Sequence, residues 1–432
     1  MINMHAFKPT QAEAQKWDAD DPLAAYREQF HLPQTAAGVP YLYLCGHSLG
    51  LQPKSVAAYV QQDLRDWATL GVEGHFMAQT PWWSYHETLA AQTARLVGAL
   101  PLEVVVMNAL TVNLHLMFVS FYRPTPQRYK ILVEADAFPS DRYAVESHLK
   151  WHGYEAQDAL IALPPREGEA AVRTEDIEAV LARDGASIAL VWLGGVNYYT
   201  GQAFDMARIT QAGHAQGCVV GFDLAHAAGN LLLHLHDWDV DCAVWCSYKY
   251  LNAGPGSVAG CFVHERHAQR PDLPRFAGWW GHNKTTRFEM PPDFDPIPGA
   301  EGWQVSNPPI LQLAALRASM DIFDQAGMDR LRAKSEQITG YLESLLDHHA
   351  LAGIRLITPR DPQQRGAQLS LRLARNGKTL HERLTQANVL CDWREPDVIR
   401  VAPAPLYNTF MEVYTFVNHL ATAHADVIRQ DS

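Results

Sequence analysis

The strongest constraint on the fold is an alternation of apolar strands and amphipathic helices between about residues 100 and 265. Strands rich in β-branched residues are predicted at 129–135, 186–194, 218–223, 242–247 and 258–264. Helical segments at 174–184 and 205–217 separate several of these strands. Strands that are apolar throughout, with helices between them, indicate a mostly parallel sheet covered on both faces. Ligands of such sheets bind beyond the carboxyl ends of the strands, so those ends are the first place to look for a site.

The pattern changes after a proline-rich loop near residues 291–298. Helices are then predicted at 308–327 and 331–349, followed by strands at 353–359 and 367–373. At 432 residues, the chain is long enough for two or three domains of roughly 150 residues each. We therefore expect an N-terminal segment (1–50) that contributes to a small domain and to the substrate site, a large cofactor-binding domain (51–309), and a small C-terminal α+β domain (310–432).

Composition argues against several other classes of protein. Hydrophobic residues make up 47% of the chain and charged residues 19%, which is typical of a globular protein and not of a disordered one. A net charge of −12 without any run of Lys and Arg argues against a nucleic-acid partner. No window approaches the roughly 18 consecutive apolar residues of a membrane span, and the first residues lack the pattern of a secretory signal. We expect a soluble cytoplasmic protein without a membrane partner.

The six cysteines fit a reduced protein better than a disulfide framework. They are scattered along the chain, and several lie in apolar runs predicted as strands. Cys242 and Cys246 could form half of a metal site, but no matching second pair follows them. The segment 234–241 contains two His and three Asp residues and is interpreted as a solvated turn between strands. No metal site is therefore predicted.

Two residues at predicted strand ends carry the main chemical signal. Asp223 ends the strand at 218–223, where a largely buried carboxylate needs a cationic partner. The pyridinium nitrogen of pyridoxal 5′-phosphate (PLP) is such a partner, and a protonated ring is an electron sink. Lys249 follows the strand at 242–247, where a lysine is costly unless it is paired or used covalently, as in an imine with an aldehyde cofactor. Occurring together in this order, the two residues predict a PLP enzyme.

Two predicted helix starts offer a place for the cofactor phosphate. Thr111 opens an apolar helix, and its backbone amide and that of Leu110 would lie near a bound anion. Ser140 or Asp141 is expected to cap a second helix. Tyr248, beside the lysine, can donate a hydrogen bond to the same phosphate.

At these residues the chain resembles the kynureninases, PLP enzymes with the aspartate-aminotransferase fold (fold type I). The resemblance extends from about residue 40 to 410, in the family's order. It rests on the blocks NALTVNLH (108–115), AFPSDRYAVESH (137–148), GFDLAHAAGN (221–230), CSYKYLNAG (246–254), GWWGH (278–282), SNPPI (306–310) and RVAPAPLYN (400–408). It implies PLP as the cofactor and a homodimer whose active sites are completed by the partner subunit.

The resemblance also implies a role for each residue of the site. Lys249 would bind the cofactor as an imine, Asp223 would pair with the pyridine nitrogen, and Tyr248 would supply or relay protons. The other implied cofactor contacts are Leu110, Thr111, Phe138, Pro139, Ser140, Asp141, His226, Trp279 and Asn307. The implied substrate contacts are Arg400 for an α-carboxylate, His75 and Ser306 for an aromatic end, and Asn307 and Ser48. The implied reaction is hydrolysis of the Cβ–Cγ bond of L-kynurenine, or its 3-hydroxy derivative, to anthranilate (or 3-hydroxyanthranilate) and L-alanine.

The clearest alternative from another class is a serine hydrolase. GHSLG (46–50) matches the Gly-x-Ser-x-Gly nucleophile elbow and follows an apolar run, with Ser48 as the nucleophile. Only about 40 residues precede it, and Pro53 indicates that the next helix begins several residues late. This hypothesis also leaves Asp223 and Lys249 unexplained.

Two further alternatives keep the cofactor. A cysteine desulfurase or selenocysteine lyase has the same fold, but it needs a reactive cysteine on a mobile loop toward the C-terminus. Cys391 is the only candidate there, and it lies in a strand-like run. The other alternative is a protein that binds PLP or a kynurenine-like ligand without turnover, and the presence of Lys249 and Arg400 argues against it.

Overall fold

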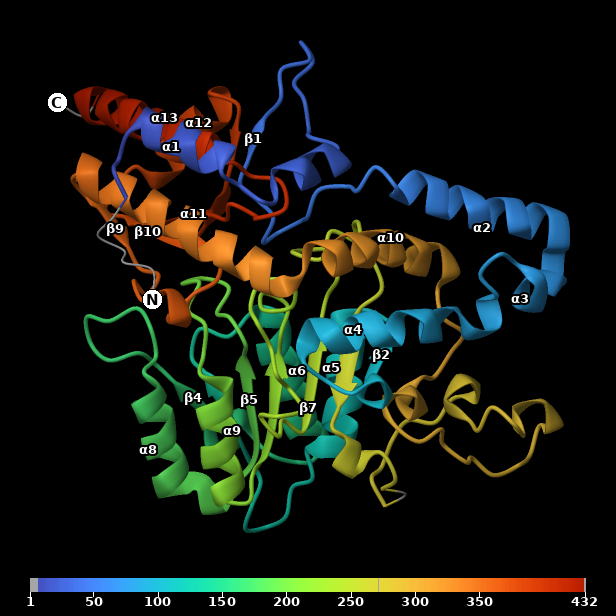
Figure 1. Cartoon of the computed structure of the whole chain (residues 1–432). Coiled ribbons are helices and arrows are strands. Elements are labelled where there is room, and N and C mark those ends of the chain that lie inside the picture. Colours follow the sequence, from blue (N-terminus) through green and yellow to red (C-terminus); the bar gives the residue numbers. More distant parts are fainter. Residues whose placement is uncertain (1–6, 271, 431–432) are drawn as a thin grey trace.

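A seven-stranded sheet forms the centre of the larger part of the molecule (Figure 1). The computed structural model describes residues 7–270 and 272–430, so the first six residues of the predicted N-terminal segment lie outside it. In sheet order the strands are β2 (Val104–Val106), β8 (Gly260–Val263), β7 (Cys242–Trp245), β6 (Val219–Asp223), β5 (Ile188–Gly194), β3 (Lys130–Glu134) and β4 (Leu160–Leu163).

The sheet is mostly parallel, as the sequence predicted. Strands β4, β3, β5, β6 and β7 run parallel to their neighbours, whereas β8 runs antiparallel to both β7 and β2. The five strands expected from the sequence are all present, and β2 and β4 were missed. β2 is only three residues long, and β4 is half-buried along its whole length, so neither gives a strong apolar signal.

Successive residues of each central strand belong to two different hydrophobic cores. Leu132 and Val191 pack in one core, together with α8 and α9, while Ile131 and Trp192 pack in the other, together with α5 and α6. Figure 1 shows these helix pairs on opposite sides of the sheet. The helices around the sheet are α4 (Ala90–Val97), α5 (Leu110–Phe121), α6 (Pro139–Trp151), α7 (Ala156–Ala159), α8 (Thr174–Asp184) and α9 (Met206–Ala215).

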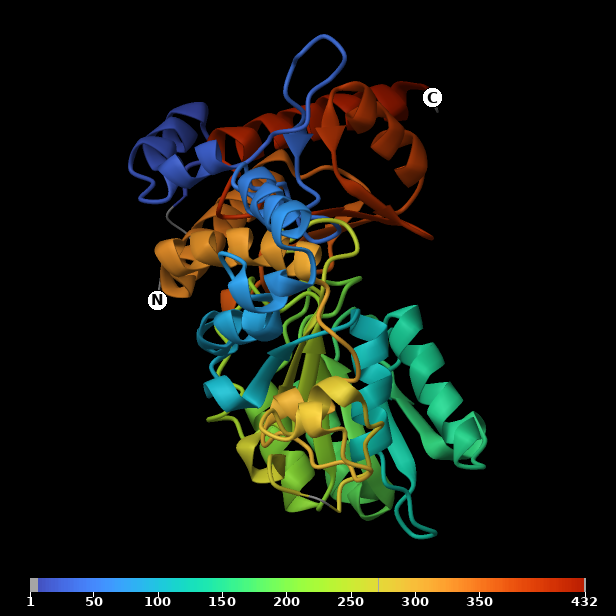
Figure 2. The same cartoon turned by 90° about the vertical axis from the view of Figure 1, so that its right-hand side faces the viewer.

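A second, antiparallel sheet in the order β12-β13-β10-β9 lies in the C-terminal part of the chain. Its strands are β9 (Ile354–Leu356), β10 (Leu369–Leu373), β12 (Asp392–Arg394) and β13 (Val398–Val401). Helices α11 (Met328–His349), α12 (Gly377–Gln386) and α13 (Phe410–Gln430) pack around it. The N-terminal helix α1 (Gln11–Ala19) lies beside α13, and β1 (Leu42–Tyr43) pairs in parallel with β11 (Val389–Leu390), so both ends of the chain meet here (Figures 1 and 2).

Three helices lie between the two sheets and along one side of the molecule. They are α2 (Val56–Leu70), α3 (Gly74–Met77) and α10 (Ile310–Ala326). Helix α10 packs along α2 and contributes to the core of the larger sheet. Among residues 7–270 and 272–430, none of the helices combines the length and apolar character needed to cross a bilayer. Each of the six cysteines is a free thiol.

The expected capping of α6 is wrong. The residue at its N-cap is Phe138, and Pro139 occupies the first turn, so Ser140 and Asp141 lie inside the helix and cap nothing. Proline is well suited to the first helical turn because its fixed φ matches a helix and its missing N–H is not needed there. Helix α5 likewise begins at Leu110, one residue before the predicted Thr111.

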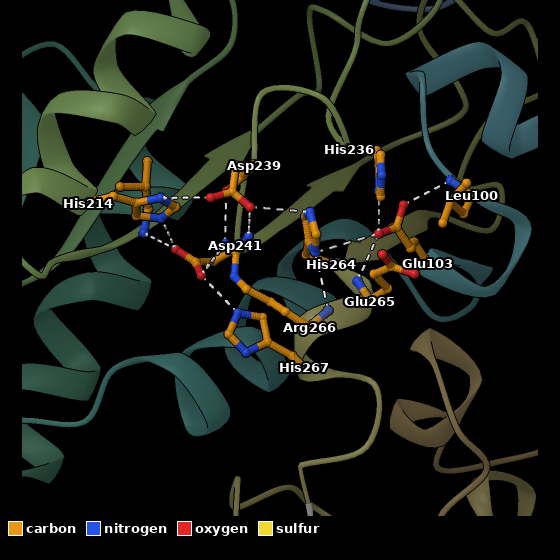
Figure 3. A network of polar contacts seen from close by, with 11 residues as sticks. Leu100, Glu103, His214, His236, Asp239, Asp241, His264, Glu265, Arg266 and His267 are labelled. Carbon is orange, nitrogen blue, oxygen red and sulfur yellow. Dashed lines mark hydrogen bonds and ion pairs between the residues drawn. The ribbon is translucent and has the colours of Figure 1, made fainter.

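The segment 234–241 is a turn between β6 and β7 with exposed His234, Asp237 and Asp239, as the sequence suggested, but at Asp241 it ends in a buried polar network (Figure 3). Asp241 is only 5% exposed. It accepts hydrogen bonds from His214, His267, Arg266 and the backbone N–H of Val220, at 2.8, 2.8, 2.6 and 2.7 Å. Burial alone would raise the pKa of Asp241, but these donors and the charge of Arg266 hold it well below its usual range.

The other half of the network is centred on Glu103. Its carboxylate accepts hydrogen bonds from the backbone N–H groups of Leu100 and Glu265, each at 2.8 Å, and from His236 Nδ1 at 2.9 Å. The ring of His236 stacks on that of His264, with centroids 5.0 Å apart. These residues connect the start of β2 with the start of β7 and the end of β8, so the acidic and imidazole groups here serve the fold.

Replacement of Asp241 by asparagine is expected to destabilise the fold by about 3 kcal/mol, because it removes the charge from a buried ion-pair network. The folded-state pKa of Asp241 is depressed, so its contribution is present above the unfolded-state pKa of about 3.9 and is lost as the pH falls below it. Urea unfolding at pH 7 and at pH 3.5 measures this difference, which should shrink at the lower pH. The matched variant Asp239→Asn, whose side chain is 60% exposed, should cost less than about 1 kcal/mol.

Candidate active site

A cavity of about 240 Å³ lies beyond the carboxyl ends of β3, β5, β6 and β7, where the fold class predicted a site. The starts of α5 and α6 close one side of it, and the loop that follows β7 closes another. Its lining residues are Ala109, Leu110, Thr111, Val133, Glu134, Ala137, Phe138, Ser140, Asp141, Trp192, Gly194, Val196, Tyr198, Asp223, Ala225, His226, Tyr248 and Lys249. The structure therefore brings together seven of the predicted cofactor contacts, together with Asp223 and Lys249.

Lys249 projects into this cavity between aromatic and imidazole side chains. Its Nζ lies 3.0 Å from His226 Nε2 and 5.8 Å from the ring centroids of both Phe138 and Tyr248. Burial, followed by the charges of Lys249 and Arg400, lowers the pKa of His226 well below its usual value. His226 is therefore neutral and can accept a hydrogen bond from the lysine ammonium.

Three buried carboxyl groups face the lysine across the cavity. Asp223 accepts a hydrogen bond from the backbone N–H of Ala225 at 2.7 Å, and Asp141 accepts one from Trp192 Nε1 at 3.1 Å. Glu134 accepts from the backbone N–H of Gly194 at 3.2 Å. The other oxygen of Asp141, Oδ2, has no hydrogen-bond partner among the described residues although it is buried.

Burial is the first cause of a raised pKa in each of these acids. The nearby charge of Asp223 raises the pKa of Asp141 further, while the charge of Lys249 opposes the rise at Asp223. The pKa of Glu134 rises to about 7. Burial thus disfavours the ionised form of each acid, and a bound cation would stabilise the negative charge on Asp223. A protonated pyridine nitrogen fits this end of the cavity.

The starts of helices α5 and α6 provide a site for an anion. Neither Ala109 at the N-cap of α5 nor Phe138 at the N-cap of α6 makes a side-chain capping bond. The first-turn amides of α5, from Leu110 and Thr111, are therefore available at the cavity wall, and the helix dipole favours an anion there. A phosphate fits this second end of the cavity.

The GHSLG loop (46–50) packs against the lysine loop, and this packing explains the glycine at position 50. The backbone N–H of Gly50 donates to Tyr248 O at 2.8 Å, and a Cβ at Gly50 would lie 2.3 Å from Lys249 O. The Ser48 hydroxyl faces Arg400 Nη2 at 3.5 Å and not an imidazole, and α2 begins only at Val56. The nucleophile-elbow hypothesis is therefore wrong, because neither a base nor a helix start lies at Ser48.

Arg400 reaches the same region from the C-terminal sheet. Its side chain is 1% exposed, and Nη1 donates to the backbone oxygen of Tyr198 at 2.6 Å. Tyr198 lines the cavity, and its ring meets that of Phe138 edge-on at 5.1 Å. The guanidinium therefore lies beside the lysine cavity, with Asp392 as its ion-pair partner.

Four predicted site residues lie outside this cavity. Trp279 is 40% exposed and belongs to an aromatic cluster with Trp83 and Phe288. His75 packs edge-on against a neighbouring tryptophan at 5.4 Å. Ser306 and Asn307 are exposed and line a separate recess. A single chain does not bring these residues to Lys249.

Several residues of the site were not selected from the sequence. Glu134 ends the predicted strand at 129–135, so the rule that identified Asp223 would have found it too. Tyr198, His47 and Asp392 carry no local signal, because only the folded chain brings them to the cavity and to Arg400.

Three proteins named kynureninase are similar to this chain over nearly their whole length. The protein from Myxococcus xanthus is 62% identical, with 97% of this chain and 99% of the relative covered. The protein from Koribacter versatilis is 61% identical (95% and 97% covered), and that from Flavobacterium psychrophilum is 53% identical (95% and 97% covered). The family described as the kynureninase C-terminal domain matches residues 331–420.

Solved structures similar to this chain show the same fold at low sequence identity. A C-DES mutant with glycine covalently linked to its PLP cofactor superposes with a TM-score of 0.76 at 18% identity, covering 91% of this chain and 98% of that one. The cysteine desulfurase CsdA from Escherichia coli has a TM-score of 0.74 at 18% identity, covering 97% and 98%. The predicted fold, that of the fold type I PLP enzymes, is thereby confirmed.

The desulfurase alternative has only this shared fold in its favour. Cys391 is 7% exposed and lies at the junction of β11 and β12. Burial raises the pKa of its thiol, which makes the reactive thiolate less accessible.

Proposed function

The chain belongs to the kynureninase family, and from this premise we propose that it hydrolyses L-kynurenine to anthranilate and L-alanine with PLP as its cofactor. It is thus proposed to be a hydrolase of carbon–carbon bonds in ketonic substrates, acting in tryptophan catabolism. The observation that carries this proposal is the placement of Lys249 between three buried acids and two uncapped helix starts. That arrangement complements a cofactor with a cationic ring nitrogen at one end and a phosphate at the other.

Each residue of the cavity has its own proposed role around the cofactor. When bound, PLP supplies an electron sink for the electrons of the bond that breaks. Lys249 would hold the cofactor by its amine and would move the proton at the substrate Cα. Asp223 would keep the ring nitrogen protonated, and Phe138 would cover the ring. Leu110, Thr111, Ser140 and Tyr248 would bind the phosphate, and Pro139 fixes the start of α6.

Tyr248 is the proposed proton donor for the hydrolytic steps. Burial is the first cause of a pKa raised well above its usual value, so the phenol keeps its proton at neutral pH. The ring lies 5.8 Å from Lys249 Nζ, on the wall of the same cavity. Arg400 is proposed to bind the substrate α-carboxylate, a planar group that its guanidinium matches.

The test of this function is an absorbance spectrum of the purified protein with PLP, followed by addition of L-kynurenine and fluorescence detection of anthranilate. A cofactor band together with anthranilate release supports the proposal. A cofactor band without anthranilate leaves the cofactor in place and overturns the substrate. The 3-hydroxy derivative, tested in parallel, identifies the preferred ring.

We propose that the active protein is a homodimer in which each cavity is completed by the partner subunit. The exposed aromatic cluster around Trp279 is an apolar surface of the kind that subunit interfaces bury. Trp279, Asn307, His75 and Ser306 lie away from the lysine cavity of their own chain, and they would reach cofactor and substrate from the second copy.

Hybrid dimers are expected to recover activity that neither parent variant has. Lys249→Ala and the double variant Trp279→Ala/Asn307→Ala each disable both sites of a homodimer, but a mixed dimer retains one intact site. Mixing under exchange conditions should give about a quarter of wild-type turnover, since half of the dimers are mixed and each has one of two sites intact. The control is the homodimer of a chain that carries all three substitutions, which should stay inactive after the same treatment. Absence of recovery despite subunit exchange contradicts the composite site.

We also propose the division of the chain that the sequence suggested: an N-terminal segment (1–50), a large domain (51–309) and a small domain (310–432). The pairing of β1 with β11 supports the assignment of the N-terminal segment to the small domain. Helix α10 starts at the second boundary and connects the two domains, because it also packs in the core of the larger sheet. A cytoplasmic location and the absence of nucleic-acid and membrane partners are proposed from the acidic charge and the scattered cysteines.

A further inference from the structure

One carboxylate oxygen holds the guanidinium of Arg400. Asp392 lies directly opposite Arg400 across the antiparallel pair β12–β13. Its Oδ2 accepts hydrogen bonds from Arg400 Nε, at 2.6 Å, and from Nη2. The same oxygen lies 3.0 Å from Arg394 Nε and 3.8 Å from His47 Nε2. Asp392 thus occupies one side of the arginine fork.

The other end of the fork remains available toward the cavity. Nη1 donates to Tyr198 O at 2.6 Å, and Nη2 faces Ser48 Oγ at 3.5 Å. Each terminal nitrogen carries two N–H groups, so a second carboxylate can still bind at the Nη1–Nη2 end. Because the side chain is 1% exposed, its orientation is fixed by these partners and not by water.

His47 is a buried group whose partner is missing. The side chain is fully buried, and neither ring nitrogen has a hydrogen-bond partner among the described residues. Burial, followed by the charge of Arg400, lowers the pKa of His47 to about 3, so the ring is neutral and retains one N–H donor. An unpaired buried donor is costly, and a small shift of Asp392 toward His47 would satisfy it.

The charges of this cluster balance only when an anion binds. Arg400 and Arg394 bring two positive charges, and Asp392 brings one negative charge. His47 adds none, because it is neutral. A carboxylate from a ligand would bring the cluster to two positive and two negative charges. Without Asp392, the two arginines would repel each other in a buried site.

We propose that Asp392 is a positioning residue for substrate binding. It holds the Nε side of Arg400, so that the Nη1–Nη2 end of the guanidinium meets the substrate α-carboxylate. His47 in turn stabilises the position of Asp392. This inference rests on the proposed carboxylate-binding role of Arg400. Pre-orientation of the fork removes an ordering cost from the binding step, so Asp392 contributes to affinity and not to the chemical step.

The test compares Asp392→Ala and Asp392→Asn in the PLP-loaded enzyme. Asp392→Ala is expected to raise KM for L-kynurenine at least about tenfold while kcat stays within about threefold. Asp392→Asn should lie between it and the wild type, because its amide oxygen still accepts from Arg400 Nε. The control is Asp347→Asn, since Asp347 forms an exposed ion pair with Arg360 and does not line the cavity, so both constants should stay unchanged.

A binding experiment tests the same inference without turnover. The change in cofactor absorbance gives Kd for L-alanine and for L-alaninamide, which has the same amine but no carboxylate. Asp392→Ala should weaken L-alanine at least about tenfold and leave L-alaninamide unchanged, and His47→Ala should weaken L-alanine less in the Asp392→Ala background than in the wild type. If Asp392→Ala does not fold, Asp392→Asn carries the test with both ligands.

Two results would overturn the inference: an unchanged KM and L-alanine Kd, or an equal loss for both ligands. The Arg400→Ala variant separates this failure from that of the proposed function. If Arg400→Ala still distinguishes L-alanine from L-alaninamide as well as the wild type does, the proposed role of Arg400 fails. If Arg400→Ala loses this discrimination and Asp392→Ala keeps it, only the positioning role fails.

Discussion

Replacing Lys249 by alanine is expected to lower kcat/KM for L-kynurenine at least about 10³-fold, with little effect on the fold. The side-chain nitrogen of Lys249 lies in the cavity, 3.0 Å from His226, and forms no salt bridge with any residue that the structure describes. The variant loses both the covalent attachment of the cofactor and the group that moves the proton at Cα. Stopped-flow spectra and anthranilate fluorescence measure the two losses separately.

Chemical rescue gives this prediction its sharpest control. A small amine such as ethylamine, added to Lys249→Ala, should restore part of the turnover by carrying the proton that the side chain would carry. Lys150→Ala, an exposed change on α6, should leave turnover at the wild-type level. Retention of more than about one per cent of wild-type activity in Lys249→Ala, without added amine, contradicts the assignment of the lysine.

The parts of the fold that could be predicted are those with a local signal. An apolar strand followed by a charged residue identified Asp223 and Lys249, because strand ends and chemistry coincide in parallel sheets. Strand β2 has three residues and β4 is half-buried, so neither differed enough from its surroundings. Ser140 and Asp141 were wrongly predicted as caps, because Pro139 occupies the first turn of α6 and the helix therefore begins before them.

Residues that act through long-range contacts could not be found in this way. Asp392 meets Arg400 through the register of β12 and β13, and His47 joins them from the opposite end of the chain. The buried role of Asp241 was missed because all four of its hydrogen-bond donors come from segments outside 234–241. The GHSLG motif was misinterpreted for the same reason, since its glycines are required by close contacts with distant residues: Gly46 with Tyr407, and Gly50 with the lysine loop.

The two buried aspartates of the cavity are expected to respond very differently to the same substitution. Asp223 has a backbone donor and the positive charge of Lys249 to stabilise its ionised form. Asp141 has an indole donor on one oxygen and, among the residues that the structure describes, no donor on the other, and burial together with the negative charge of Asp223 raises its pKa well above the usual value. Two neighbouring carboxyl groups in a low-dielectric site share one negative charge, and these partners place that charge on Asp223.

Asp223→Asn is therefore expected to lower kcat at least about 100-fold, as the loss of a charge-assisted hydrogen bond of about 3 kcal/mol to the ring nitrogen predicts. Asp141→Asn copies the protonated form of Asp141 and should cost less than about tenfold. The cofactor absorbance as a function of pH provides the second measurement, because the ring nitrogen should lose its proton at a lower pH in Asp223→Asn alone. Equal losses in the two variants would mean that the negative charge is divided between the carboxyl groups, whereas a reversed order would assign it to Asp141. Either result would mean that the hydrogen bond from the backbone N–H of Ala225 to Asp223 does not determine which of the two aspartates is ionised.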